Sequence, residues 1–229
     1  MISVICCTIR DNMMENVFRN YDTQKMKKKE LIIILNEDKM DRAKWIRRSS
    51  RSKNVSVYRL SKKTTLGECL NFAIHKAKYD IVAKIDDDDY YAPRYLSQQV
   101  KALKNKKADV VCKRTVYMYF EQEKKLAIHL DGDGENKFLY QAEGAKGSTF
   151  VFRKKIRRKI KFSPLNMDED MIFLRECTKH HYKIYATDKK NYVCFRRSER
   201  LHTWSVPNQS LLEESKIIRR TKHYKRYVQ

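Results

Sequence analysis

Four consecutive aspartates at residues 86–89 are the strongest candidate for chemistry in this sequence. They directly follow a largely apolar run at residues 81–85, which predicts a buried strand, and an aromatic-proline step follows them. Carboxylates this close repel one another, and a divalent cation with hard oxygen ligands relieves the repulsion. Mg²⁺ or Mn²⁺ fits better than zinc, because His and Cys are not clustered. The alternatives are a solvated acidic turn before a helix expected at Pro93 and neutralisation by the chain's many lysines, but the position after a strand favours a metal.

A second carboxylate group lies at residues 168–170, where the pattern predicts the start of a helix. Acidic residues at such a position often cap the helix and complement its dipole, and we assign Asp168 to that role. A reaction that holds a metal and an anionic leaving group also needs a base, which a carboxylate from a different element could supply. Asp170 is the candidate base.

The other polar candidates follow the early strands. Thr8 and Arg10 come after the first apolar run, and Asn36 and Glu37 come after the second. Because ligands of open α/β sheets bind beyond the carboxyl ends of the strands, these groups describe one cleft. The cationic and aromatic candidates for holding phosphates, each of which could also be an ordinary surface or core residue, are Arg10, Lys62, Lys63, Arg200, His202 and Trp204.

A sheet must bring these distant segments to one edge. In the first half, short β-branched runs alternate with helical patterns, which predicts an α/β domain with parallel strands covered on both faces. The best-defined helix follows Thr65, which forms a capping box with Glu68. From about residue 108 the strands follow one another through short polar links, which suggests an antiparallel or mixed extension. A basic C-terminal helix is expected from Ser210, with Glu213 completing its capping box.

Composition limits the possible functions. The 229 residues carry 51 Lys and Arg against 28 Asp and Glu, a net charge of +23. That excess implies a polyanionic partner such as nucleic acid, an anionic polymer or an acidic membrane surface. The six cysteines form no C-x-x-C motif and predict reduced thiols in a cytoplasmic setting. We expect no signal peptide and no transmembrane segment, so that any membrane contact would be peripheral.

Five segments together resemble the family 2 nucleotide-sugar glycosyltransferases of the GT-A fold, in order and in spacing. They are SVICCTIRD (3–11), ELIIILNED (30–38), the run from LGECL to PRYL (66–96), GSTFVFRK (147–154) and DEDMIFL (168–174). The resemblance implies a Rossmann-like nucleotide-binding half with a mixed sheet over residues 1–107 and an acceptor half over 108–205. Residues 206–229 would add the basic helix.

The resemblance also implies a role for each candidate. The nucleotide would contact Thr8 and Arg10, Glu37 would meet the uracil ring, and Asp87 would lie near the ribose. Asp88, with Asp86, would bind the metal, and Asp170 would be the base. The expected donor- and acceptor-binding residues are Gly147, Ser148, Glu169, His202 and Trp204. Two departures from the family pattern are Asn36-Glu37 in place of the commoner Asp-Asp, and Leu70 where many members have Arg.

These roles describe an inverting, metal-dependent transfer of a sugar, with a UDP-sugar as the expected donor. Mg²⁺ or Mn²⁺ would stabilise the leaving diphosphate, and Asp170 would deprotonate the attacking hydroxyl. The acceptor could be a surface polymer, a glycoprotein or DNA with a hydroxylated base, and the charge favours an anionic polymer or DNA. The alternatives are a non-enzymatic nucleic-acid-binding protein and a metal-dependent nuclease.

Overall fold

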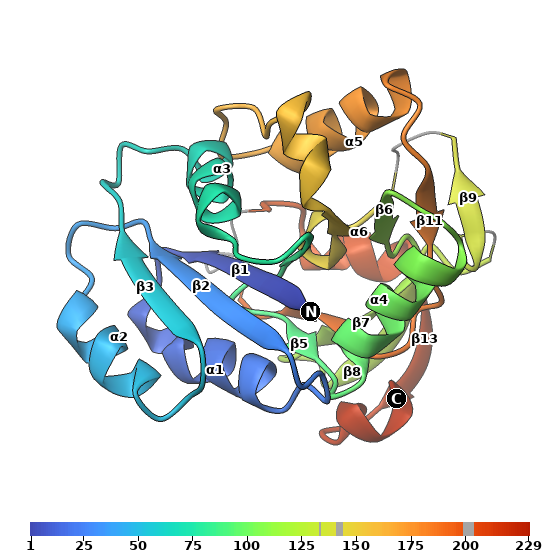
Figure 1. Ribbon diagram of the computed structural model, residues 1–229. Coiled ribbons are helices and arrows are strands. Elements are labelled where there is room, and N and C mark those ends of the chain that lie inside the picture. Colours follow the sequence, from blue (N-terminus) through green and yellow to red (C-terminus); the bar gives the residue numbers. More distant parts are fainter. Residues whose placement is uncertain (133, 141–143, 199–203) are drawn as a thin grey trace.

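The computed structural model describes residues 1–132, 134–140, 144–198 and 204–229. Its larger sheet has the strand order β3-β2-β1-β4-β10-β6-β11-β9 (Figure 1). The strands of this sheet are β1 (Ile2–Thr8), β2 (Lys29–Leu35), β3 (Val55–Arg59), β4 (Ile81–Lys84), β6 (Val110–Cys112), β9 (Lys137–Leu139), β10 (Val151–Arg153) and β11 (Ile184–Ala186).

The first half is the parallel α/β arrangement that the sequence predicts. Strands β3, β2, β1 and β4 are parallel neighbours, and β1 pairs with β2 over its whole length. Helices lie on both faces of the sheet (Figure 1). They are α1 (Met14–Asp22), α2 (Arg42–Ser49), α3 (Leu66–Lys76), α4 (Tyr95–Asn105) and α5 (Glu169–Lys179).

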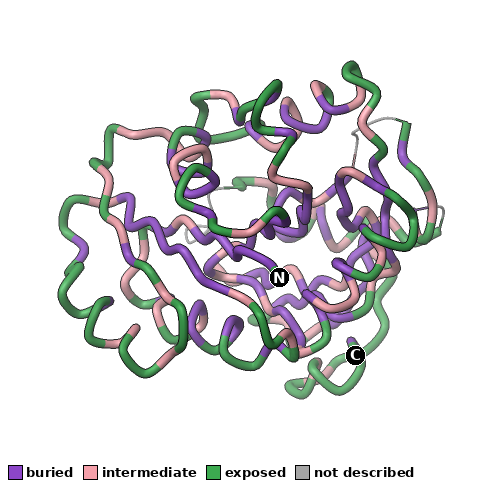
Figure 2. The backbone as a smooth tube through the Cα atoms, viewed as in Figure 1, coloured by how far each residue is buried: buried purple, intermediate pink, exposed green. Residues whose placement is uncertain are grey.

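Alternating side chains of the strands supply the core on each face. In β2, Ile33 packs in one cluster with Phe18 of α1 and Trp45 of α2. Its neighbour Ile34 packs in the other cluster with Leu70 of α3. Successive residues of a strand point to opposite faces, so an uninterrupted apolar run such as β2 requires cover on both sides. Figure 2 shows these strands as a buried interior beneath more exposed helices and loops.

The second half confirms the expected mixed extension. Strand β10 is antiparallel to both β4 and β6, whereas β11 is parallel to β6. A smaller sheet has the order β13-β8-β7-β12-β5. Its strands are β5 (Tyr90–Tyr91), β7 (Val116–Phe120), β8 (Lys125–His129), β12 (Tyr192–Arg196) and β13 (Ser215–Arg220). Short 3-10 helices elsewhere in the chain are η1 (Asp11–Met13), η2 (Gly147–Thr149), η3 (Lys154–Arg158) and η5 (Tyr224–Tyr227).

One of the two predicted capping boxes is present. At the start of α3, the backbone N–H of Thr65 donates to the Glu68 carboxylate (2.8 Å), and the N–H of Glu68 donates to the Thr65 hydroxyl (3.4 Å). The box expected at Ser210 is absent, because α6 (Asn208–Glu213) begins two residues earlier and Ser210 lies inside it. The helix expected at Pro93 begins at Tyr95 instead.

The predicted C-terminal basic helix is wrong. Within residues 206–229 the one α-helix is α6. The basic stretch that follows it is strand β13, which pairs antiparallel with β8. Ile217 and Ile218 are β-branched, and β8 would otherwise present an open edge, so pairing outweighs the helical pattern. Residues 215–220 are therefore an edge strand of the smaller sheet.

The described ranges contain no helix that is both long and apolar enough to cross a membrane. All six cysteines are free thiols; Cys7 and Cys194 are half-buried and the others are buried. Burial raises the pKa of the Cys6 thiol, which keeps it protonated and inert.

Candidate active site

Polar segments after three strands meet at one edge of the larger sheet. Thr8 ends β1, Asn36 follows β2, and Asp86 lies two residues beyond β4. Because these strands are parallel, their carboxyl ends share an edge. The backbone N–H of Asn36 donates to the carbonyl of Thr8 (2.8 Å), so the first two segments touch. We call the side where β1, β2 and β4 end the acidic edge.

The four aspartates divide into two accessible and two buried side chains. The side chains of Asp86 and Asp88 are 39% and 14% exposed, whereas that of Asp87 is 3% exposed and Asp89 is buried. The two residues expected to bind a metal are therefore the two that a ligand can reach.

Arg10 joins the loop after β1 to the aspartates. Its Nε donates to Asp87 Oδ2 (3.1 Å), and its Nη2 pairs with Asp87 and lies 3.0 Å from Asp88 Oδ2. The Thr8 hydroxyl also donates to Asp87. Burial raises the pKa of Asp87, while the hydrogen bond from Arg10 opposes that rise. The Asp87 carboxylate is thus held by protein groups, and its contact with a ribose stays a prediction.

Asp89 fixes the loop to the smaller sheet. The Tyr192 hydroxyl donates to its Oδ2 (2.5 Å), and the backbone N–H of Phe195 donates to its Oδ1 (2.9 Å). Burial and the nearby charge of Asp88 raise the pKa of Asp89 to about 8. A buried carboxyl group with two internal donors serves to position its neighbours.

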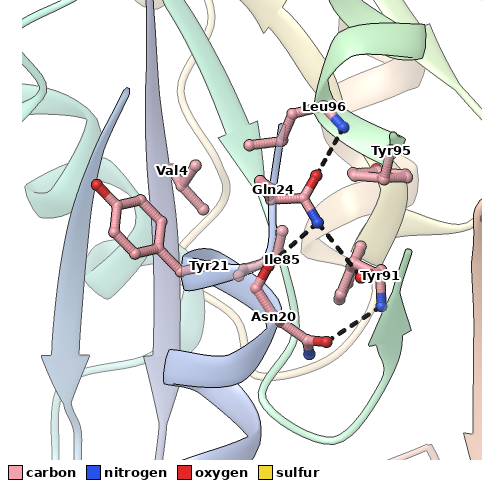
Figure 3. Close-up of a pocket in the computed structure, with 8 residues that line it drawn as sticks. All are labelled: Val4, Asn20, Tyr21, Gln24, Ile85, Tyr91, Tyr95 and Leu96. Carbon is pink, nitrogen blue, oxygen red and sulfur yellow. Dashed lines mark hydrogen bonds between the residues drawn. The ribbon is translucent and has the colours of Figure 1, made fainter. Parts of the chain in front are cut away.

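Side chains of helix α1 donate hydrogen bonds to the backbone of the same loop. The Asn16 side chain donates to the carbonyls of Asp87 (2.7 Å) and Asp89 (2.9 Å). Figure 3 shows Asn20 and Gln24 bonding the backbone of Tyr91 and Leu96 around a small cavity. The cavity holds only 10 Å³, about the room for one water, so it is part of the scaffold and not a substrate site.

Lys84 links the aspartates to the second carboxylate group. It is 4% exposed at the end of β4, and its Nζ lies 2.7 Å from Asp86 Oδ1. Burial alone would lower the pKa of Lys84, but attraction to Asp86, Glu169 and Asp170 raises it. Burial also raises the pKa of Glu169, to about 7, against the opposing charge of Lys84. The buried Lys84 ammonium therefore pairs with Asp86 and is also attracted by the charges of Glu169 and Asp170 of α5.

Gly147 lies directly against Asp170, the predicted base. A Cβ added at Gly147 would overlap the carboxylate and the Cβ of Asp170, so a glycine is required for this close approach. The next residue, Ser148, is buried, and its hydroxyl shares a hydrogen bond with Tyr192 (2.7 Å). Gly147, Ser148 and Asp170 form one wall of the site.

Helix α3 positions the segment that leads into α5. The Asn71 side chain donates to the carbonyl of Phe162 (2.8 Å) and accepts from its N–H (3.0 Å). A Cβ at Gly67 would overlap the carbonyl of Ser163, so the two backbones are in contact there. Asn71 and Gly67 of α3 thus hold the chain that leads to Asp170.

Trp204 lies beside a lysine that interacts with the predicted base. Lys146 Nζ is 4.7 Å from the centre of the Trp204 ring, which is 38% exposed. Burial lowers the pKa of Lys146, and the charges of Cys194 and Asp170 oppose that shift. Arg196 holds the backbone, donating to the carbonyl of Trp204 (3.2 Å). Trp204 is thus held beside Lys146 and Arg196, and its contact with a diphosphate stays a prediction.

The remaining predicted residues are Asp168, Glu37, two lysines and two residues outside the described ranges. Asp168 does not cap α5: it adopts a left-handed conformation (φ 64°), is exposed and makes no side-chain capping bond. Glu37 is half-buried at the acidic edge, while Lys62 and Lys63 are exposed loop residues. The remaining two candidates, Arg200 and His202, lie outside the described residues.

The sequence interpretation missed Lys84, Lys146 and Tyr192. Lys84 had a usable signal, since a lysine inside a buried strand needs a counter-charge. Lys146 and Tyr192 had none, because their partners come from segments far apart in the chain.

The donor set suits a hard divalent cation. Asp86 and Asp88 offer accessible carboxylate oxygens, the ligands that Mg²⁺ and Mn²⁺ prefer. Across the described ranges, no group of three or more His, Cys, Asp or Glu side chains is placed to hold a metal. Two protein ligands are enough where substrate phosphates and water complete the shell, as is usual for Mg²⁺.

Comparison with known families agrees with this geometry. The profile described as glycosyl transferase family 2 matches residues 3–162, which include β1 to β4 and the aspartates. Comparison with curated protein sequences found no match.

Several solved structures share the fold. S. aureus TarS 1–349 in complex with UDP-GlcNAc has a TM-score of 0.61 and 18% identity over 86% of this chain and 59% of that one. The mannosyltransferase PcManGT from Pyrobaculum calidifontis, in complex with GDP-Man and Mn²⁺, has a TM-score of 0.64 and 15% identity over 92% and 58%. GalNAc-T7 with UDP, GalNAc and Mn²⁺ has a TM-score of 0.68 and 12% identity over 86% and 44%.

The chain thus spans between 44% and 59% of the lengths of these three proteins, and at such identities the likeness shows the fold alone. The family profile covers more than half of the chain, from the first strand past η3. The chain therefore belongs to glycosyl transferase family 2 and has the GT-A fold.

Proposed function

We propose that this protein moves a sugar from a nucleotide diphosphate sugar, first of all a UDP-sugar, to an acceptor hydroxyl, with a divalent metal and with inversion. The supporting observation is that Asp86 and Asp170 both adjoin residues 147–148. The backbone N–H of Asp86 donates to the Tyr91 hydroxyl (2.8 Å), which donates to the Ser148 carbonyl (2.8 Å), and Gly147 lies against the Asp170 carboxylate. A candidate base and a candidate metal ligand thus face one site from separate elements.

The chemistry follows from these positions. Asp88 and Asp86 would hold Mg²⁺ or Mn²⁺, which when bound stabilises negative charge on the leaving diphosphate. Asp170 accepts the proton of the acceptor hydroxyl as that oxygen forms its bond to the anomeric carbon, while the bond to the diphosphate oxygen breaks on the opposite face. A single displacement of this kind inverts the anomeric configuration.

The donor is oriented by the residues around the aspartates. Thr8, Arg10 and Glu37 would contact the nucleotide, with Asp87 near the ribose. Structures with the same fold are complexes with UDP-GlcNAc, GDP-Man, or UDP and Mn²⁺, which supports a nucleotide sugar and a divalent metal here. The donor- and acceptor-side wall would comprise Gly147, Ser148, Glu169, His202 and Trp204.

The acceptor is proposed to be a polyanion. The net charge of +23 favours an anionic polymer or DNA over a neutral glycan. Acceptor affinity should then fall steeply as the salt concentration rises, and a product assay with each polymer would separate the two.

The first experiment measures thermal stability with nucleotides. UDP together with Mn²⁺ should raise the melting temperature, whereas UDP alone and Mn²⁺ alone should have little effect. GDP and Mg²⁺ serve as comparisons for the base and the ion. DNA binding that is insensitive to nucleotides, with no effect of UDP and Mn²⁺, would contradict the proposal and favour a nucleic-acid-binding module.

The second experiment removes the two key carboxylates. Asp88→Asn and Asp170→Asn should each lower the transfer rate by a factor of about 10² to 10⁴, without loss of the folded state. Asp80→Asn, an exposed aspartate at the other end of β4, is the matched control and should keep full activity. Full activity in Asp170→Asn would rule out its role as the base.

A further inference from the structure

The opposite edge of the larger sheet carries a row of cations that the proposed reaction does not use. The parallel strands begin on this side, and the segments leading into them are rich in exposed lysines: Lys28 precedes β2, Lys53 precedes β3, and Lys78 precedes β4. We call the row the cationic edge. It comprises Lys27, Lys28, Lys53, Lys78, Lys107, Lys155, Arg157, Arg158 and Lys183, all exposed.

Hydrogen bonds show that these segments adjoin and form one continuous surface. Each contact joins the start of one strand to the segment beside it. The contacts are Ile2 to Lys28 (3.2 Å), Lys78 to Glu30 (2.6 Å), Lys154 to Asp80 (2.7 Å) and Asp109 to Lys183 (2.9 Å). The charges therefore lie along a single side of the sheet.

The cationic edge has a hollow near its middle. It has a volume of 220 Å³ and is lined by Asp80, Lys154, Lys155, Arg157 and Arg158. Asp109 pairs with Lys155 (3.4 Å), so one of the few acids nearby is already neutralised. The hollow is cationic and large enough for a phosphate-bearing headgroup.

The position of this surface argues against a role in holding the reacting end of an acceptor. Strand β1 spans seven residues from one edge to the other, which separates the cationic edge from Asp86 and Asp88 by roughly 20 Å. An acceptor polymer bound along the cationic edge would lie at the end of the sheet opposite to the candidate active site. A surface that binds the whole protein through the cationic edge would leave the acidic edge accessible on the opposite side.

The residue types favour a diffuse anionic surface over a specific phosphate site or a nucleic acid. The row consists of lysines except for Arg157 and Arg158, and lysine acts as a hydrated point charge where arginine gives bidentate phosphate recognition. Tyr140, 84% exposed, lies one residue beyond the pairing of Leu139 with Ile184, at the same end as Lys183. Tyrosine is favoured at the interface between membrane and water.

From this arrangement we propose that the cationic edge docks the protein peripherally on an anionic lipid surface, with the acidic edge facing away from the lipid. Each lysine near such a surface strengthens binding about fivefold, and the effect decays within a Debye length. The contact is electrostatic, without an inserted segment. It does not depend on the identity of the sugar donor or acceptor.

The test is co-sedimentation of the full chain with vesicles. Vesicles containing about 30 mol% phosphatidylglycerol should bind the protein at low salt and release it at high salt, whereas pure phosphatidylcholine vesicles should not bind it. The variant Lys28→Glu/Lys53→Glu/Lys78→Glu/Arg158→Glu should bind at least about 100-fold more weakly. These residues come from four segments, are exposed and are not in the active site. Donor binding by the variant should therefore be unchanged, and unchanged donor binding would show that the variant is folded.

A matched control separates the surface from net charge. The variant Lys190→Glu/Lys216→Glu/Arg220→Glu/Lys222→Glu reverses four exposed cations outside the cationic edge. It should keep most of its vesicle binding. Equal loss in both variants, or vesicle binding that is unaffected by the cationic-edge variant, would overturn the proposal. Binding to DNA but not to anionic vesicles would also overturn it and would assign the surface to a nucleic acid.

Discussion

The two edges of the larger sheet differ in how their charges are held. At the acidic edge, carboxylates are buried or half-buried and bonded to protein groups, as Asp87 is to Arg10 and Asp89 to Tyr192. At the cationic edge, Lys28 and Lys53 are exposed in loops. The first edge is organised by internal contacts, whereas the second presents its charge to an external partner.

The fold itself favours this separation. Helices that follow parallel strands begin at the edge where the strands end, and they finish at the edge where the next strands begin. Helix N-termini therefore lie near the acidic edge and C-termini near the cationic edge, and the helix dipole favours those signs by about 0.3–1 kcal/mol per charge. Burial then makes the acidic charges far more costly to disturb.

The largest effect should come from Lys84→Met. This substitution removes the buried cation that faces Asp86, Glu169 and Asp170, and leaves uncompensated negative charge. The free energy of unfolding should fall by about 3 kcal/mol, as measured by urea denaturation in EDTA. Saturating Mn²⁺ should restore part of the loss. An unfolding free energy equal to that of the wild type would show that the carboxylates do not depend on Lys84.

The next effect is on the rate, through Gly147→Ala. The added methyl group overlaps Asp170, so the carboxylate must shift from its position against Gly147. A displacement of about 1 Å at a catalytic group lowers kcat by about 100-fold. Steady-state kinetics should show this loss in kcat with little change in KM for the donor. A rise in KM for the donor with kcat nearly unchanged would place the disturbance in donor binding instead of in the base.

A pH dependence should distinguish Glu169 from surface acids. Burial raises its pKa from 4.5 to about 7, so the folded protein keeps a proton between these values that the unfolded chain has released. The free energy of unfolding should therefore fall as the pH rises through this window, by at most about 1.4 kcal/mol per pH unit. Glu169→Gln should make this slope smaller in denaturation measured across the window in EDTA, while Asp89, whose pKa is raised to about 8, keeps its own share of it.

The control for that slope is Glu176→Gln on the same helix. Glu176 pairs with Lys179, and this hydrogen bond lowers its pKa, so its effect has the opposite sign. The slope between pH 4.5 and about 7 should survive in this variant. Its disappearance would mean that the pH dependence does not arise from Glu169.

Local pattern was enough to predict most of the first half of the fold. The parallel strands and the capping box at Thr65 depend on short segments whose apolar pattern and spacing can be read directly. The C-terminal segment failed because its structure depends on β8, a strand that is distant in sequence. The sequence of residues 215–220 does not indicate that β8 has an unpaired edge with which this segment can pair.

The site shows the same limit. The aspartate run and the carboxylates at 168–170 could be singled out because they follow a strand end and mark a helix start. The choice of Asp86 and Asp88 within the run came from the family resemblance, and the roles of Asp86, Asp88 and Asp170 stay predictions. The contact between Gly147 and Asp170 could be expected only from the family resemblance, and the place of Lys84 only from the folded structure. Asp168 failed as a cap because a left-handed backbone turns its side chain away from the helix N-terminus.

The smallest effect should come from Lys155→Met at the cationic edge. Lys155 and Asp109 form an ion pair, as Lys84 and Asp86 do, but the Lys155 side chain is 61% exposed and that of Lys84 only 5%. Water screens the exposed pair, so its loss should change the free energy of unfolding by less than about 1 kcal/mol, and less again in high salt. Urea denaturation beside Lys84→Met makes the comparison direct. A loss as large as that of Lys84→Met would mean that the cationic edge is bound by internal contacts as tightly as the acidic edge, and that its charge is not free for a partner.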